Sequence, residues 1–348
     1  MRIRSHDLRN RVLIVAEIGN NHEGDFALAR ELVCAAAETG VDAVKFQTFI
    51  PEQFIAASQP DRLARLRRYA LSAEQFAELA DLAREKELLF ISTPLDLDSA
   101  TILQPLVDAY KIASGDNTFY PLISQIAQTR MPVILSGGLA TIDELSTAAD
   151  LIRLLWGREH ANPGLAILHC VSAYPTPPEQ ANLAAIRTIA HAIRCVPGYS
   201  DHTLGIEAAV LSVGLGARII EKHFTLDHNQ SDFRDHQLSA TPDEMRELAR
   251  RVREAELLLG NGEKRAQPAE RDGLVRYRRS VAARRNLSAG STIGPDDLCW
   301  VRPGDGIPPG QEHQLIGRAL KAPVAAGALL ALGMVETEDS ATAVAESH

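Results

Sequence analysis

The sequence has few cysteines, and they form no functional pattern. The four cysteines, Cys34, Cys170, Cys195 and Cys299, are scattered, and no two of them form a C-x-x-C pair. This spacing argues against a disulfide framework and against a thiolate zinc site. Free cysteines of this kind are usually small buried hydrophobic residues.

Long hydrophobic runs and excess positive charge are also absent. No apolar run approaches the roughly 20 residues that cross a bilayer. The apolar run at 12–19 is too short for a signal peptide and has no small-residue cleavage site. The formal net charge of −9 gives no general basic field for nucleic acid. We therefore expect a cytoplasmic protein that binds neither a membrane nor nucleic acid.

Short β-rich runs alternate with helical stretches along most of the chain. Eight strands are predicted, at 12–19, 42–48, 88–94, 109–114, 132–138, 165–175, 195–203 and 217–225. The helix predicted at 72–86 begins with a capping box, Ser72 and Gln75. Eight such units in about 250 residues are typical of an α/β fold, the (β/α)8 TIM barrel. A doubly wound open sheet is the rival, but AEIGNNHEG in the first strand and its turn lacks the GxGxxG fingerprint.

Composition divides the chain into four segments. Residues 1–260 form the predicted barrel domain, and the charged stretch 261–280 is a predicted linker. Residues 281–337 are rich in Gly and Pro and contain short β-like runs, which predicts a second, small, β-rich domain. We expect 338–348 to be a disordered tail.

Polar residues collect where the predicted strands end. In a barrel, the carboxyl ends of the strands form the functional face. The residues at these ends are Glu17, Lys45, Gln47, Lys111, Ser114, Ser136, His169, Ser172, Tyr174, Ser200, Asp201, His202, Glu221, Lys222 and His223. The sequence therefore predicts a polar site at the mouth of the barrel.

Lysines are rare, and half of them lie in unusual places. The chain has 36 basic residues, of which only six are Lys, and Lys45, Lys111 and Lys222 lie inside apolar strands. A buried ammonium group needs a partner. Lys45 and Lys111 indicate a phosphate or carboxylate site, and private pairing with a nearby acid is the alternative. Because side chains alternate along a strand, an inward His223 places Lys222 outward, paired with an acid; we expect Glu221 on that outward side too.

Two histidines end neighbouring predicted strands. His202 and His223 are separated by one βα unit. Adjacent imidazoles can bind a divalent metal through nitrogen and leave positions open for substrate. Two separate hydrogen-bonding histidines are the alternative. We assign no role to His22 or His228.

Eight segments resemble, in this order, the sialic acid (N-acetylneuraminate) synthase family: AEIGNNHEGD, AVKFQT, STPLD, YKIASGD, PVILSGG, HCVSAYPTP, YSDHTLG and EKHFTLD. The C-terminal WVRPGDGI and IGRALKAPVAAGALL are similar to that family's antifreeze-like (SAF) domain. The resemblance extends over about residues 12–336, and the combination of motifs is specific.

The resemblance implies a transferase of carbohydrate biosynthesis. Such a nonulosonic acid synthase condenses phosphoenolpyruvate with the open-chain aldehyde of N-acetylmannosamine or a related N-acyl hexosamine and releases phosphate. A divalent metal, Mn²⁺ or Mg²⁺, is implied at His202 and His223, acting as a Lewis acid on the aldehyde. A domain-swapped homodimer is also implied.

The resemblance also assigns roles to individual residues. Phosphoenolpyruvate contacts are implied for Lys45, Lys111, Ser114, Ser136, Ser172 and Ser200. Sugar contacts are implied for Gln47, Asp116, Tyr174, Asp235 and, reaching into the partner subunit's site, Arg302. The resemblance places Glu17 at the catalytic centre. Glu17 and Asp235 are the candidate catalytic residues, and either carboxylate is able to move the proton.

Several positions depart from the family pattern at the sugar end. Asp116 stands where a glutamate is common, Ser172 replaces an asparagine, LSGG replaces LSTG, and QSDFRDH replaces a Gly-Pro-Asp-type loop. The acceptor therefore stays open between N-acetylmannosamine, a 2,4-diacetamido-trideoxyhexose (for legionaminic or pseudaminic acid), and another hexose of a surface or spore-coat polysaccharide. Two other functions remain as alternatives: a metal-dependent pyruvate aldolase, and a non-catalytic ice- or carbohydrate-binding protein.

Overall fold

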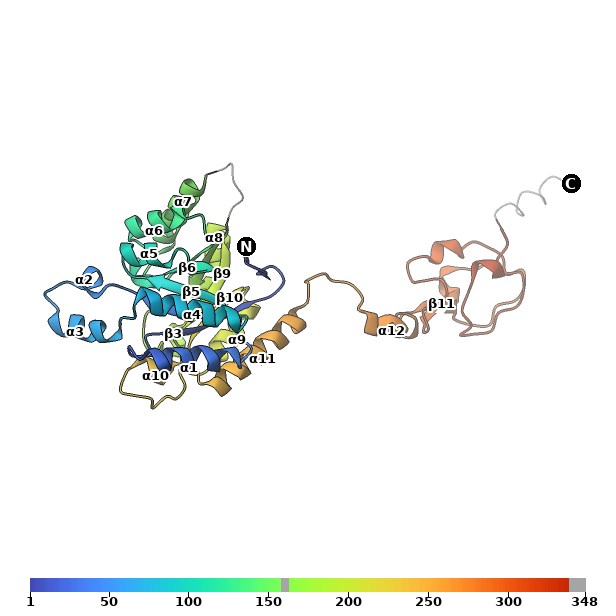
Figure 1. Ribbon diagram of the computed structural model, residues 1–348. Helices are drawn as coiled ribbons and strands as arrows, with labels where there is room; N and C mark the ends of the chain where they lie inside the picture. Colours follow the sequence, from blue (N-terminus) through green and yellow to red (C-terminus); the bar gives the residue numbers. More distant parts are fainter. Residues whose placement is uncertain (158–162, 338–348) are drawn as a thin grey trace. The chain divides into compact units, whose positions relative to one another are not determined.

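The computed structural model describes residues 1–157 and 163–337, so the expected disordered tail at 338–348 lies outside the described residues. The chain divides into two compact units, Met1–Asn261 and Gly262–His348 (Figure 1). Each unit has its own hydrophobic core.

Eight parallel strands of the first unit close into a barrel, which confirms the predicted TIM-barrel fold (Figure 1). Neighbouring strands follow one another along the chain, and β10 pairs with β3 to close the ring. The strands are β3 (Leu13–Gly19), β4 (Ala43–Thr48), β5 (Leu89–Pro94), β6 (Ala109–Ile112), β7 (Val133–Ser136), β8 (Leu165–His169), β9 (Val196–Asp201) and β10 (Ile219–His223). They are almost entirely buried, because helices cover the outer face of a parallel barrel.

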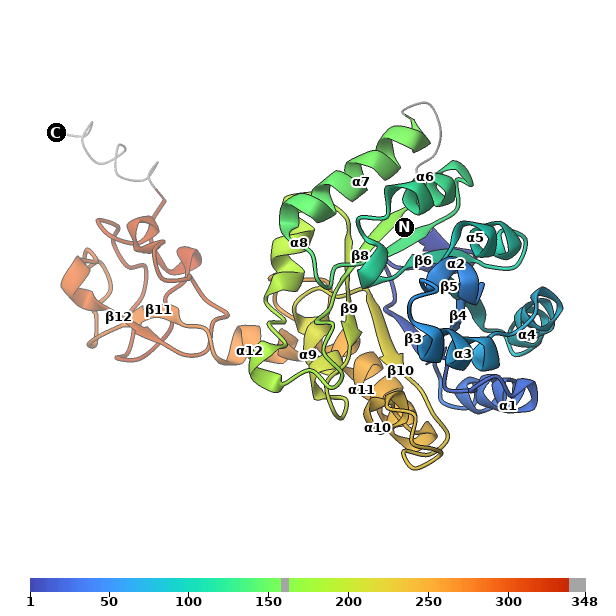
Figure 2. The same cartoon turned by 90° about the vertical axis from the view of Figure 1, so that its left-hand side faces the viewer.

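Helices surround these strands (Figure 2). They are α1 (Phe26–Ala37), α2 (Pro51–Phe54), α3 (Pro60–Tyr69), α4 (Ala73–Glu85), α5 (Leu97–Leu103), α6 (Tyr120–Gln128), α7 (Ile142–Trp156), α8 (Ala185–Ile193), α9 (Glu207–Gly214), α10 (Asp235–Leu238) and α11 (Pro242–Leu259). The predicted capping box at Ser72 and Gln75 is present at the start of α4. The apolar faces of the long helices pack on the outer side of the strands and form the main core.

Strand register brings the site residues to one level. His223 of β10 pairs with Glu17 of β3, and Glu17 pairs with Lys45 of β4. Gln47 pairs with Thr93 of β5. Residues far apart in the sequence thus become direct neighbours around the carboxyl end of the barrel.

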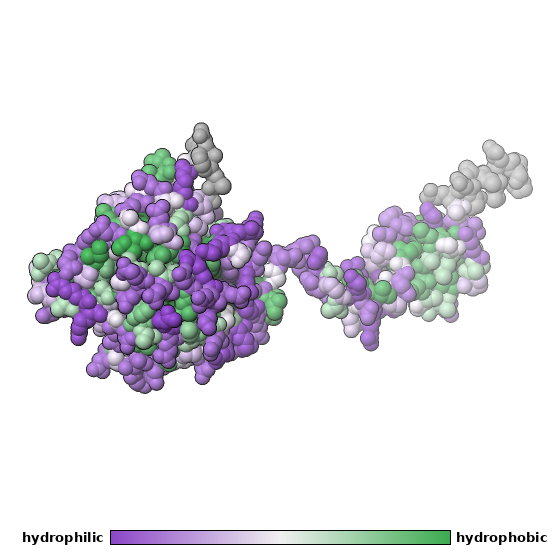
Figure 3. Space-filling model, viewed as in Figure 1, coloured by the Kyte–Doolittle hydropathy of each residue, from purple (hydrophilic) through white to green (hydrophobic). Residues whose placement is uncertain are grey.

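A short N-terminal hairpin closes the other end. Strands β1 (Arg2–Ile3) and β2 (His6–Asp7) pair antiparallel. Ile3 and the following Leu8 are buried in a cluster with Leu13 and other residues of the barrel interior. This apolar cluster fills the amino-terminal end of the barrel. The face shown in Figure 3 is largely hydrophilic over the barrel unit.

The second unit is small and β-rich, as predicted. Strands β11 (Ser280–Ala283) and β12 (Leu298–Val301) pair antiparallel. Further chain segments join this pair through isolated bridges and enclose a core of aliphatic residues. The predicted linker 261–280 contains a helix, α12 (Arg271–Arg276), which its high charge concealed. Among the described residues, no helix is long and apolar enough to cross a membrane.

Candidate active site

Most of the predicted site residues line one cavity at the carboxyl ends of the strands. This reaction cavity has a volume of about 370 Å³. The predicted residues that line it are Glu17, Lys45, Gln47, Lys111, Ser114, Asp116, Ser136, Tyr174, Ser200, His202 and His223. Ser172 lines a neighbouring cavity instead, Asp235 lies in the loop after β10, and Arg302 belongs to the second unit.

Two lysines and two glutamates form a buried charge cluster in the reaction cavity. Lys45 Nζ lies 2.9 Å from Glu17 Oε2 and 3.6 Å from Glu221 Oε1. Lys111 Nζ lies 3.8 Å from the same Glu221 oxygen. All four side chains are at most 8% exposed, so each charge depends on its neighbours rather than on water. The acid partners considered for Lys45 and Lys111 are therefore present, but in a shared network that faces a cavity.

Hydroxyl groups orient this network. Lys111 Nζ donates to Ser136 Oγ at 2.5 Å, and Lys45 Nζ donates to Thr93 Oγ1 at 3.2 Å. Ser200 Oγ donates to Glu221 Oε1 at 2.9 Å. These bonds fix each ammonium group before a ligand arrives, which lowers the entropic cost of binding an anion.

Glu221 faces the cavity, so the expectation that it points outward is wrong. Side chains alternate along β10, and residues 221 and 223 therefore share one face. Lys222 takes the opposite face and is 1% exposed. Its Nζ lies 3.1 Å from Asp201 Oδ2 and also donates to the Thr203 carbonyl, which confirms the expected outward pairing of Lys222 with an acid.

The pKa values of the four ionisable groups in this cluster are shifted in different directions. Burial raises the pKa of Glu17, with Lys45 opposing the shift and Glu221 adding to it. For Glu221, burial is outweighed by Lys111 and Lys45, and the pKa falls to about 2. Burial would lower the pKa of Lys45, but Glu17 and Glu221 raise it overall, whereas burial lowers the pKa of Lys111. Glu17 thus holds a proton more readily, and Lys111 loses one more readily, than an exposed group.

The two predicted histidines lie side by side at the cavity wall. The ring centroids of His202 and His223 are 5.5 Å apart. His202 Nδ1–H donates to the Val171 carbonyl at 2.8 Å, which leaves Nε2 with its lone pair. His223 Nδ1 is buried and has no hydrogen-bond partner among the described residues. Burial lowers the pKa of each to about 4, so both imidazoles are neutral near pH 7 and able to bind a metal.

An aromatic and carboxylate layer lies next to this pair. The Tyr174 ring centroid is 4.1 Å from that of His202. The Arg234 guanidinium lies 4.9 Å from the centroid of the same Tyr174 ring. Arg234 Nε lies 3.2 Å from Asp235 Oδ1, whose side chain is 14% exposed. After burial, the Asp235 charge is the largest influence on the pKa of His223, and it acts to raise it. Asp235 therefore lies near the histidines without lining the cavity.

Two further predicted sugar contacts, Gln47 and Asp116, line the same cavity. Gln47 Nε2 donates to Glu17 Oε1 at 3.1 Å, and Gln47 Oε1 accepts from Asn20 at 2.9 Å. Burial raises the pKa of Asp116 to about 6, although Lys111 opposes the shift. Polar groups that can donate and accept hydrogen bonds thus line the same cavity as the histidines.

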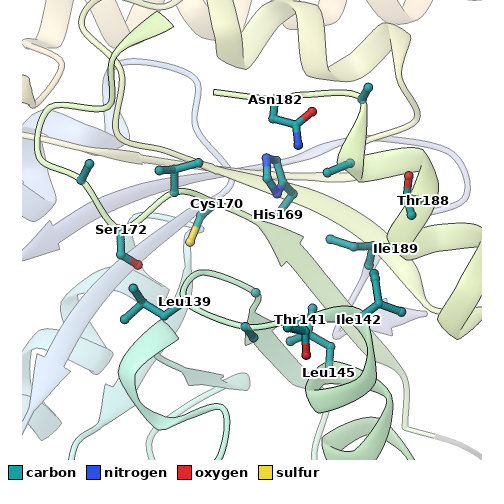
Figure 4. A pocket seen from close by; sticks show the side chains of 16 residues that line it. Leu139, Thr141, Ile142, Leu145, His169, Cys170, Ser172, Asn182, Thr188 and Ile189 are labelled. Atoms are coloured by element: carbon teal, nitrogen blue, oxygen red, sulfur yellow. The ribbon is translucent and has the colours of Figure 1, made fainter. Parts of the chain in front are cut away.

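Ser172 lies behind the reaction cavity, in a second cavity of about 650 Å³. Figure 4 shows Ser172 and Cys170 near Leu139 in this space. Ser172 Oγ is buried without a hydrogen-bond partner among the described residues. A Cβ on Gly138 would come within 2.5 Å of Ser172 Oγ and 2.6 Å of Ser114 Oγ. Gly138 therefore permits both hydroxyls to approach the boundary between the two cavities.

Six lining residues were not predicted: Phe54, Arg62, Thr93, Leu95, Ala113 and Gly115. Glu221 also lines the cavity; the sequence placed it at a strand end, and its spacing of two residues from His223 could have shown that it faces inward. Thr93 could have been found from its place at the end of β5. Phe54 and Arg62 come from α2 and α3, two helices that hydrophobic periodicity did not indicate. Arg302 lies 5.8 Å from the Tyr277 ring within the second unit, and its role in a partner's site stays a prediction.

Together, the barrel and its buried polar cavity define a TIM-barrel protein with a functional mouth at the carboxyl ends of its strands. The chain belongs to the NeuB family, whose model matches residues 32–264, and it carries a SAF domain at 278–336. The resemblance to the sialic acid synthases and their C-terminal domain is thereby confirmed.

Individual relatives match nearly the whole chain. An uncharacterized protein of Methanocaldococcus jannaschii is 44% identical over 88% of this chain and 90% of its own length. The N,N'-diacetyllegionaminic acid synthase of Legionella pneumophila is 38% identical over 91% of this chain and 92% of its own. The crystal structure of N-acetylneuraminic acid synthetase from Leptospira borgpetersenii aligns with a TM-score of 0.72 and 33% identity, over 76% of this chain and 90% of that one.

Proposed function

We propose that this protein is a nonulosonic acid synthase. It condenses phosphoenolpyruvate with the open-chain aldehyde of an N-acyl hexosamine and releases phosphate. The observation that carries the proposal is the convergence of two buried lysines and two neutral histidines on one cavity. Membership of the NeuB family supports the same reaction class.

Phosphoenolpyruvate binds at the lysine end of the reaction cavity. The phosphate and carboxylate of this substrate need cations, and Lys45 and Lys111 are the cations there. Ser114, Ser136 and Ser200 supply hydroxyl donors around them. Ser172 contributes to this end if its unpartnered hydroxyl turns toward the substrate. Neutralising the substrate's charges reduces the repulsion that would otherwise oppose attack on the aldehyde.

A divalent metal fits the histidine end. His202 offers Nε2, and the buried Nδ1 of His223 has no hydrogen-bond partner within the described part of the chain. Imidazole nitrogens favour Mn²⁺ over Mg²⁺, since Mg²⁺ is usually held by oxygen ligands. Among the described residues, no group of three or more His, Cys, Asp or Glu suits a metal, so these two histidines would be its protein ligands. When bound, the metal supplies Lewis acidity at the aldehyde oxygen.

The acceptor sugar occupies the side lined by Gln47, Asp116 and Tyr174, with Asp235 in the adjacent loop. Glu17 and Asp235 are the candidate groups for moving protons, and the raised pKa of buried Glu17 suits such a role near neutral pH. Arg302 completes the sugar site of the partner subunit in a domain-swapped homodimer. The 38% identity to a legionaminic acid synthase makes a 2,4-diacetamido-trideoxyhexose a serious candidate beside N-acetylmannosamine.

Turnover with a panel of acceptors tests this proposal. Purified protein is incubated with phosphoenolpyruvate, Mn²⁺ and each of several hexosamine derivatives, and product mass and phosphate are measured. We expect one acceptor to give a keto acid whose mass equals acceptor plus pyruvate, and chelation of the metal to abolish it. If no acceptor consumes phosphoenolpyruvate, the proposal is wrong. Cleavage of a keto acid to pyruvate without any phosphate chemistry would instead indicate an aldolase.

A further inference from the structure

Two loops at the carboxyl ends of neighbouring barrel strands are fastened to each other. The loop 20–25 follows β3, and the loop 224–239 follows β10, which is the strand next to β3 in the barrel. Asn21 Nδ2 donates to the Phe224 carbonyl at 2.7 Å and to Ser239 Oγ at 3.0 Å. These bonds hold the two ends of the longer loop against the shorter one.

The strongest link between the loops is a buried histidine. His236 is 1% exposed. Its Nε2 lies 3.1 Å from Glu23 Oε1, and its Nδ1 lies 2.7 Å from Thr225 Oγ1. Because a carboxylate can only accept, Nε2–H is the donor to Glu23. The same Glu23 oxygen accepts from Ser231 Oγ at 2.5 Å, so one carboxylate holds two points of the longer loop.

Asp235 is the residue next to this histidine. It begins the single-turn helix α10, and its main-chain carbonyl accepts from Ser239 Oγ at 2.6 Å. On the other side, the Phe233 ring packs against Tyr69 at 5.4 Å between centroids. We propose that Glu23 and His236 form a clamp that positions Asp235 toward the acceptor sugar. This inference rests on the proposed function and adds two positioning residues to it.

The middle of the longer loop is mostly exposed to solvent. Residues 227, 229, 230, 232 and 234 are exposed, so few apolar contacts anchor this segment. Segments with few buried contacts open at low cost in free energy. A hydrogen bond to a charged group is stronger than one between neutral groups, so its loss can decide whether such a loop is closed. The clamp therefore controls the position of Asp235 rather than the stability of the barrel.

Steady-state kinetics test the clamp through the difference between two substrates. In Glu23→Ala, we expect the KM of the acceptor to rise by about tenfold or more, the equivalent of losing one such bond. The KM of phosphoenolpyruvate should stay within about twofold, because Lys45 and Lys111 are untouched. Glu23→Gln keeps an acceptor oxygen and should restore most of the acceptor affinity. Asp227→Ala is the matched control, since Asp227 is an exposed carboxylate of the same loop whose Oδ1 accepts from the Asn229 N–H at 2.8 Å; we expect little change.

Limited trypsin digestion tests the clamp independently of turnover. Cleavage after Arg234 requires the loop to open, so it should be faster by about tenfold or more in Glu23→Ala, and near the wild-type rate in Glu23→Gln and Asp227→Ala. Equal rises in both KM values, or equal cleavage rates in Glu23→Ala and wild type, would overturn the clamp. If wild-type protein turns over no acceptor, the proposed function fails, while the digestion still decides whether the clamp exists.

Discussion

Glu221 shows how one buried carboxylate can set the protonation of a whole site. It lies within 4 Å of both lysines, at 3.6 Å from Lys45 and 3.8 Å from Lys111. Its own pKa of about 2 keeps it charged at all physiological pH values. Glu221 thereby favours the charged form of both lysines in a cavity where burial favours their neutral forms.

Replacing Glu221 by Gln should move the alkaline limb of kcat/KM for phosphoenolpyruvate to lower pH. Burial already lowers the pKa of Lys111, and Glu221 is the first of the charges that oppose this. Without that carboxylate, Lys111 loses its proton at lower pH and no longer attracts the substrate's anion. The pH profile of kcat/KM reports this group in the free enzyme. A limb that stays in place or moves upward contradicts the prediction, and the exposed Glu207→Gln serves as the control.

The buried Asp116 carboxylate should destabilise the unliganded protein at neutral pH. Its pKa is raised from 3.8 to about 6, mainly by burial. Folded and unfolded states are both protonated below about pH 4, so the variant and wild type differ little there. As pH rises toward about 6, the folded wild-type protein must charge a buried carboxylate. It therefore loses stability relative to the Asp116→Asn variant. We therefore expect Asp116→Asn to raise the Tm at about pH 8 but not at about pH 3.5; thermal unfolding at both values checks this, and an equal shift at both would contradict it.

At the scale of elements, the loops above the barrel depend on close backbone contacts. Gly24 has a φ of +89°, and a Cβ there would lie 1.8 Å from the Arg68 carbonyl oxygen of α3. The loop after β3 therefore lies directly against α3, the helix that brings Arg62 to the cavity. Only glycine permits this approach.

Gly24→Ala should destabilise the protein more than another left-handed glycine does. Forcing an Ala into a left-handed conformation costs about 1–2 kcal/mol, and Gly205→Ala, with φ of +71° and no atom within 4 Å, should cost only that. Gly24→Ala must in addition displace α3. Urea titrations give the free energy of unfolding of each variant. Together with the KM of the acceptor, these values distinguish Gly24→Ala from Gly205→Ala. Equal losses in both variants would show that the contact with α3 carries no strain.

The sequence predicted some elements better than others, for physical reasons. The eight barrel strands were predictable because buried parallel strands are continuous apolar runs. Helix α3 was not, because its PDRLARLRRY is mostly polar and only Leu63 and Leu66 are buried. The N-terminal hairpin was missed because strands of two residues have no periodicity. At the site, strand-end side chains were predictable from alternation, whereas Ser172 and Asp235 follow loop paths that tertiary contacts decide.

At the scale of the whole molecule, the question is whether the SAF unit contributes a residue to the active site of its own chain or to that of a partner chain. Arg302 lies in this unit, and the resemblance to sialic acid synthases assigns it to the sugar site of a partner. A site assembled from two chains makes activity depend on both members of a dimer. This dependence can be measured without knowing how the units are arranged.

Mixing two inactive variants should restore activity. His223→Ala removes a proposed metal ligand, and Arg302→Ala removes the proposed contact from the partner, so each homodimer should be nearly inactive. After subunit exchange, random pairing makes half of the dimers mixed, and each mixed dimer has one site with both residues, which gives about a quarter of the wild-type rate. The rate of keto acid formation after co-refolding or co-expression measures this. Absence of any recovery in confirmed mixed dimers would mean that Arg302 acts within its own chain.

The central claim is that phosphoenolpyruvate and a sugar aldehyde are joined in the cavity of Lys45, Lys111, His202 and His223. The most direct measurement follows phosphate and phosphoenolpyruvate together in one reaction, with and without the acceptor found in the panel. The account predicts that one phosphate is released and one keto acid is formed for each phosphoenolpyruvate consumed, only when both acceptor and metal are present. Phosphate release that does not depend on the acceptor, or keto acid formation without phosphate release, would contradict it.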